Sequence, residues 1–173
     1  MFAVKQRRGR LLSARREVTE QNRIRNGYER NLAQQLITSF NRIGKRSADQ
    51  YEYGGINAID QRLIIKDLSD VIVPNVRAVM TAMIDRFVLL RQKQSPFESY
   101  LDEYINTQVG TRIELISATT LALIRKAILD GTGEDLGPSQ IARLIRDRVS
   151  TIGRRRAITI ARTETHSAAS FAN

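Results

Sequence analysis

The stretch Arg154-Arg-Arg-Ala-Ile-Thr-Ile-Ala-Arg-Thr-Glu-Thr-His-Ser-Ala-Ala-Ser-Phe-Ala-Asn173 is the most informative part of this sequence. Small and apolar residues recur in it at spacings of three and four, which is the pattern of one face of an α-helix. Most of them are alanines, so this face can approach a partner helix closely. We therefore predict a helix that docks through an alanine face, formed by Ala157, Ile160, Ala161, Glu164, Ala168 and Phe171 or Ala172.

Polar side chains crowd the same segment: Arg162, Thr163, Glu164 and His166, the only histidine of the chain. Positions two apart on a helix do not face each other, so Arg162 and Glu164 are expected to reach separate partners, or Glu164 pairs with an arginine elsewhere. Arg162 and His166 are four apart and are expected to be neighbours, with His166 neutral. The favoured interpretation is that these groups fix how the helix docks on the bundle or on a following domain, because buried charges need partners.

A family resemblance rests on the same residues. The segments Arg156-Ala157, Ile160-Ala161-Arg162-Thr163-Glu164-Thr165-His166 and Ala168-Ala169 resemble the signature of the phage head morphogenesis proteins, the phage Mu F-like minor head proteins. Residues 139–145 resemble the helix that precedes that signature, so the resemblance covers 139–173. Two features depart from the family pattern. Ser170 stands where the family commonly has Asn, and family members usually continue into a further domain.

The resemblance implies a non-enzymatic minor head protein of a tailed phage. Such a protein would associate with the portal vertex during capsid assembly, remain in the virion and contact the packaged DNA. Its implied partners are the portal protein, the major capsid protein, or both, together with DNA. It would be made in the host cytoplasm and end in the phage head.

The charge balance supports a polyanionic partner. Lys and Arg number 28 against 18 Asp and Glu, which gives a net charge of +10 and a pI of about 10.6. Such an excess favours nonspecific binding to nucleic acid through release of counterions from phosphates. Arginine also suits bidentate pairing with carboxylates of a protein partner. The residues expected to contact DNA or a partner are Arg7, Arg8, Arg10, Arg15, Arg16, Arg154, Arg155 and Arg156.

Composition argues against several other classes of protein. Cysteine is absent and only one histidine is present, so we expect no disulfide, no metal site and no cofactor. No window approaches the roughly 20 apolar residues of a membrane span. One histidine and one buried-type glutamate do not supply a converging nucleophile, base and orienting group, so we predict no enzymatic activity.

Helical spacing dominates the rest of the chain, and no stretch alternates like a strand, so we predict an all-α fold. Long antiparallel helices are expected at about 15–50, 57–94 and 95–130, with a kink or break near Val73 because Pro74 lacks an N–H. A loop at 131–138 would lead into two short helices, 139–149 and 150–173, separated near 151–153. The predicted division is a basic, extended N-terminal arm at 1–14, a long-helix bundle at 15–130, and a short helical pair at 131–173 that carries the family signature and leads into a further domain.

Three alternatives stay open from the sequence. The short helical pair is also typical of a helix-turn-helix DNA-binding regulator, with Arg154 to Arg156 at the start of the recognition helix. The chain could instead be the leader of a fused enzyme domain beyond residue 173. The near-heptad stripe at 68–90, within helix 57–94, predicts packing in the chain's own bundle or self-association with a second copy.

Overall fold

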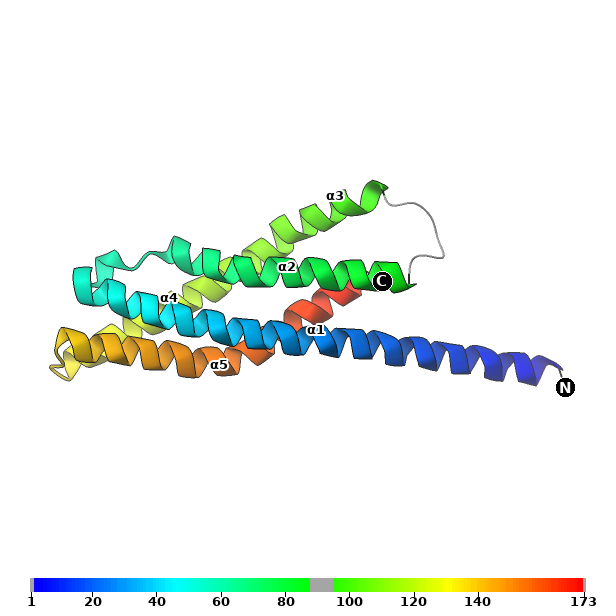
Figure 1. The fold of residues 1–173 in the computed structure, drawn as a ribbon, viewed down its shortest axis with the longest axis horizontal. Helices are drawn as coiled ribbons and strands as arrows, with labels where there is room; N and C mark the ends of the chain where they lie inside the picture. The colour runs from blue at the N-terminus through cyan, green and yellow to red at the C-terminus, as the bar shows by residue number, and fades with distance from the viewer. Residues whose placement is uncertain (1, 88–94, 173) are drawn as a thin grey trace.

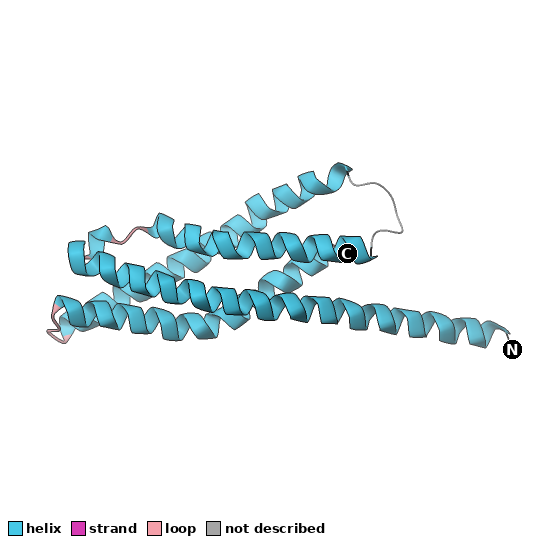
Figure 2. Cartoon of the chain, in the orientation of Figure 1, coloured by secondary structure: helices cyan, strands magenta, loops and turns pink. Residues whose placement is uncertain are grey.

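The chain forms an all-α bundle without a strand in the described residues (Figures 1 and 2). The computed structural model describes residues 2–87 and 95–172, with side chains described over 15–85 and 98–172. Its elements are α1 (Phe2–Gly54), a short 3-10 helix (Ile56–Ala58), α2 (Gln61–Phe87), α3 (Ser95–Tyr104), a π-helical turn (Ile105–Val109), α4 (Gly110–Gly133) and α5 (Pro138–Phe171).

Four long helices pack side by side, and neighbours along the chain run in opposite directions (Figure 1). α1 packs most extensively against α5 and also against α2, while α4 packs against α5 and α2. The N-terminal part of α1 projects beyond the other helices, and α3 diverges from α2 (Figure 1). α5 therefore lies between α1 and α4 and belongs to the same bundle as the other long helices.

The core consists of one apolar stripe from each long helix, as the helical spacing predicts. Nearly all of these side chains are fully buried, so removing them from water is the main force that holds the helices together. The stripe of α2 from Leu68 to Met83 packs inside the bundle, so it offers no open surface to a second copy of the chain. The principal core residues are Leu32, Leu36, Phe40 and Ile43 of α1, Leu68, Ile72, Val76, Val79, Met80 and Met83 of α2, Ile113, Ile124 and Ala127 of α4, and Ile141, Ile145 and Val149 of α5.

The predicted extended arm at 1–14 is helical instead, because α1 begins at Phe2. Gly9 is the only residue of this segment with a poor helix propensity, and it is surrounded by Lys, Arg, Gln, Leu and Ala, which favour helix. Arg7, Arg8 and Arg10 lie outside the residues whose side chains the structure describes.

The predicted pair of short helices is wrong, because α5 runs without interruption from Pro138 to Phe171. Gly153, the expected breaker, is instead buried against α1. A Cβ at Gly153 would lie 2.5 Å from both Cβ and Cγ of Phe40. This glycine therefore serves close packing, and the helix-turn-helix interpretation loses its turn.

Pro74 lies inside α2 and does not end it. Proline removes one backbone donor, the N–H that would meet the Asp70 carbonyl four residues earlier, and crowds the preceding turn. The next residue adds a side-chain hydrogen bond to that turn, since Asn75 Nδ2 donates to the Val71 carbonyl at 2.8 Å. The same amide donates to Gln35 Oε1 on α1 at 2.9 Å. The third predicted helix, 95–130, is divided by the π-helical turn, and the loop before α5 shrinks to 134–137.

Candidate functional site

The alanine face of α5 is buried, as expected from its spacing. Ala157, Ala161 and Ala168 are all 0% exposed, whereas Ile160 is half-buried and packs at the edge of the core. With no side chain longer than a methyl group at these three positions, α5 can sit close to its neighbours. The family-like segment is thus a structural part of the bundle, and its polar residues point to two seams on either side.

The seam between α5 and α4 holds a buried ion pair. Glu164 is 2% exposed, and Arg112 Nε on α4 lies 2.8 Å from its Oε1 and 3.0 Å from its Oε2. Arg112 Nη2 also donates to the Tyr104 hydroxyl at 3.0 Å, and the guanidinium lies 5.6 Å from the centre of the Tyr104 ring. The Tyr104 ring in turn packs against Phe171 with centroids 4.3 Å apart. Glu164 does pair with an arginine elsewhere in the chain, which was one of the two predicted arrangements.

Burial and charge oppose each other at this pair. Burial raises the pKa of the Glu164 carboxyl, and the Arg112 guanidinium offsets part of that rise. At Arg112 burial works against the charged form, yet the Tyr104 hydrogen bond and the Glu164 charge outweigh it and raise the pKa of the guanidinium. Arg112 is therefore the group that favours the charged form of this buried carboxyl.

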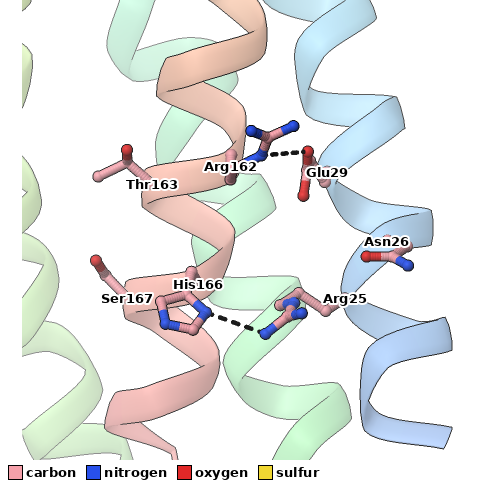
Figure 3. Close-up of a pocket in the computed structure, with 7 residues that line it drawn as sticks. All are labelled: Arg25, Asn26, Glu29, Arg162, Thr163, His166 and Ser167. Carbon is pink, nitrogen blue, oxygen red and sulfur yellow. Dashed lines mark hydrogen bonds and ion pairs between the residues drawn. The ribbon is translucent and has the colours of Figure 1, made fainter. Parts of the chain in front are cut away.

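The seam between α5 and α1 forms an open polar groove, here named the α1/α5 groove (Figure 3). Arg162 Nε lies 3.2 Å from Glu29 Oε1, and Arg25 Nη1 lies 3.0 Å from His166 Nδ1. His166 thus contacts α1 rather than the predicted neighbour Arg162. The groove has a volume of about 560 Å³ and is lined by Arg25, Asn26, Glu29, Arg162, Thr163, His166 and Ser167.

The contact between Arg25 and His166 fixes the tautomer of the imidazole. A guanidinium has only donors, so Nδ1 of His166 must accept the hydrogen bond and cannot carry a proton. The proton of the neutral ring is then on Nε2, which becomes a donor.

Arg156 is placed differently from its predicted role as a DNA or partner contact. Its guanidinium turns inward, donating to Thr119 Oγ1 at 2.8 Å and to Thr120 Oγ1 at 3.1 Å. It also lies 5.6 Å from the centre of the Phe40 ring. Burial lowers the pKa of Arg156. This side chain joins α5 to α4 and α1 and is not free to meet a phosphate.

The other predicted contact residues whose side chains the structure describes are exposed but fall into two separate places. Arg15 and Arg16 lie on α1, and Arg154 and Arg155 lie on α5. The contact of Gly153 with Phe40 places the α5 pair level with the C-terminal half of α1. Phe40 lies 25 residues after Arg15, or about 38 Å along the helix at 1.5 Å per residue. The fold does not bring these four arginines into one patch.

Sequence reasoning missed the partners that the motif residues select. The partners lie far from residues 162–166 in the sequence, yet they make the contacts described above. They are Arg112, Tyr104, Arg25 and Glu29. A glutamate on an alanine face signals that a cation must be near, but the chain has 28 lysines and arginines to choose from. Only the packing of the helices selects the partner.

Two further features concern metals and membranes. Within residues 15–85 and 98–172, His, Asp and Glu form no cluster of three or more that could hold a metal ion. Among the helices of the described part of the chain, none combines the length and the apolar character that a membrane crossing requires.

Comparison with known proteins gives no match: no family model, no curated protein and no solved structure is similar to this chain.

Proposed function

We propose that this chain is a non-catalytic minor head protein of a tailed phage, which associates with the portal vertex and holds packaged DNA through phosphate contacts. The observation that carries the DNA part is a row of exposed arginines on α1. The head-protein part rests on the resemblance of residues 156–169 to the head morphogenesis signature. The buried state of Glu164 and of the alanines around it supports a scaffolding role for that motif rather than a catalytic one.

The row, here named the α1 arginine face, comprises Arg15, Arg16, Arg23 and Arg30, all exposed. At about 100° per residue these four positions fall within roughly 100° of the helix circumference. Carboxylates of the described side chains neutralise little of the positive charge of this row. Among the described side chains, Arg23 meets a carboxylate only at 3.8 Å, on Glu20, and Arg30 donates to the Asn26 carbonyl. From Arg15 to Arg30 the face is about 22 Å long, enough to meet several consecutive phosphates.

Four arginines on one face predict a particular salt dependence. Each neutralised phosphate releases counterions and contributes about −0.9 to the slope of log K against log salt concentration, so the full face predicts a slope contribution near −3.6. Contacts of this kind carry no base sequence, so binding should not depend on the DNA sequence.

Fluorescence anisotropy with a labelled DNA duplex at several salt concentrations tests this. The variant Arg15→Gln/Arg16→Gln/Arg23→Gln/Arg30→Gln should lose about three to four units of slope. The matched control removes four exposed cations elsewhere, Arg62→Gln/Arg125→Gln/Lys126→Gln/Arg143→Gln, and should lose clearly less. An equal loss in both variants would show that only net charge matters. Site-selective binding that survives competitor DNA would favour a regulator instead.

The head-protein part is tested in the particle. Antibodies against this chain should detect it in purified virions and in DNA-free proheads at a few copies per particle. Its complete absence from purified virions would rule out a structural role in the head.

A further inference from the structure

Arg25 is an arginine at an open groove that meets no carboxylate among the described side chains. It donates to His166 Nδ1 at 3.0 Å and to Asn22 Oδ1 at 2.9 Å, both neutral acceptors. Two other arginines at the helix seams have an acidic partner, since Arg112 has Glu164 and Arg162 has Glu29, whereas Arg156 donates to the hydroxyls of α4 and is turned inward. A guanidinium carries five N–H donors, so Arg25 keeps up to three for a ligand.

We propose that the α1/α5 groove binds a carboxylate on an acidic segment of a partner protein. Arg25 would hold the carboxylate through its remaining donors, in the paired geometry that guanidinium and carboxylate favour. The Nε2–H of His166 adds a donor, because Arg25 fixes the tautomer of that ring. Thr163 and Ser167 also line the groove, from the side of α5 that is turned away from α1 in Figure 3.

The groove suits a peptide better than a DNA strand for two reasons. First, Glu29 lies in the groove wall, where it would repel a run of phosphates, whereas a single carboxylate can meet Arg25 and leave the Glu29–Arg162 pair intact. Second, the amide of Asn26 both donates and accepts hydrogen bonds. A peptide backbone supplies both kinds of partner, but a phosphodiester can only accept.

The α1/α5 groove would bind an acidic protein segment, whereas the α1 arginine face would bind DNA. It stands on the geometry of the groove and does not depend on the chain being a head protein. Its failure would leave the DNA and virion experiments unaffected, and their failure would leave the groove unaffected.

The single histidine makes the site directly observable. In NMR spectra of the full chain with labelled histidine, His166 gives one set of ring signals. A short peptide whose only charged side chains are two glutamates should shift these signals, and the shift should reach saturation as the peptide concentration rises. The same peptide with glutamines should leave them unchanged. Inorganic phosphate and a DNA duplex serve as comparison ligands, and both should shift the signals less than the glutamate peptide does.

Two matched variants separate the groove from net charge. Arg25→Gln should weaken binding of the glutamate peptide by more than about tenfold, as expected for loss of a charged hydrogen-bonding partner. Lys45→Gln removes an exposed cation from the same helix outside the groove and should change the affinity by less than twofold. Equal shifts with both peptides, no shift with the glutamate peptide, or displacement of that peptide by DNA would each overturn the assignment. The wild-type titrations decide the matter even if Arg25→Gln does not fold.

Discussion

Replacing Arg112 by methionine should destabilise the bundle more than replacing its partner Glu164 by methionine. The reason is the difference in exposure: the Glu164 side chain is 2% exposed, while 26% of the Arg112 side chain is open to solvent. Without Arg112 the carboxylate is left in a site that water does not reach. Without Glu164 the guanidinium keeps the Tyr104 hydroxyl at 3.0 Å and partial hydration.

Breaking a buried ion pair by removing one partner costs about 3–5 kcal/mol, and replacing both partners by apolar groups is often close to neutral. We therefore expect Arg112→Met to lose about 3–5 kcal/mol at neutral pH and Glu164→Met about 1–3 kcal/mol, reduced because water can still reach the guanidinium. The double variant should lose less than Arg112→Met alone, which is a coupling that independent sites do not show.

The pH dependence distinguishes the two variants further. Burial raises the pKa of Glu164 above its ordinary value of 4.5, and Arg112 works in the opposite direction. In Arg112→Met the pKa of Glu164 in the folded chain rises further. Between the folded and the unfolded pKa of this carboxyl, the folded chain therefore binds more protons than the unfolded chain. Stability then falls as pH rises through that window, with a slope of up to about 1.4 kcal/mol per pH unit. Arg112→Met should thus regain stability in acid relative to wild type, and the variants that lack Glu164 should not.

Urea unfolding followed by circular dichroism at several pH values between 5 and 8 measures all four proteins. Equal and additive losses in the two single variants, with the same pH dependence in both, would refute the reasoning. That result would mean that the carboxylate is hydrated or held by another group.

Further substitutions test close packing and buried polarity. Gly153→Ala should lower the free energy of unfolding by at least about 1–3 kcal/mol, because its Cβ would overlap Phe40, and thermal melting measures the loss. Gly27→Ala meets no atom within 4 Å and should raise stability by up to about 1 kcal/mol, so a loss there would contradict a continuous α1. Thr165→Val should be neutral or stabilising, since the Thr165 hydroxyl is buried with no hydrogen-bond partner in the described part of the chain. A loss above about 1 kcal/mol would show that this hydroxyl has a partner.

The helical fold was predictable because its signal is local. Leu32, Leu36, Phe40 and Ile43 recur at helical spacing, and the same residues are buried in α1. The alanine face of α5 was predictable for the same reason. Each of these features follows from the spacing of residues within one turn or two of each other.

Helix ends and partners were harder to predict, because they depend on packing between distant segments. Gly153 resembles a helix breaker in the sequence, but its role is to let Phe40 approach. Pro74 likewise predicts a kink or a break, but α2 continues through it, and the next residue, Asn75, links α2 to Gln35 of α1. Arg156 looks like a surface cation until the hydroxyls of α4 are placed beside it.

The length of α1 has a mechanical consequence. With 53 residues it extends about 80 Å, roughly twice the length of the 27-residue α2, and its free end lies outside the bundle (Figure 1). The N-terminal turns of α1 project beyond the bundle, while its contacts with α5 hold the rest of the helix in place. A force on those first turns therefore tilts α1 about these contacts. Of the two polar contacts with α5 described above, the Arg25–His166 contact is nearer the projecting end of α1, so tilting α1 strains it before the Arg162–Glu29 pair. A pull on the tip would therefore reach the only histidine of the chain before it reaches Arg162.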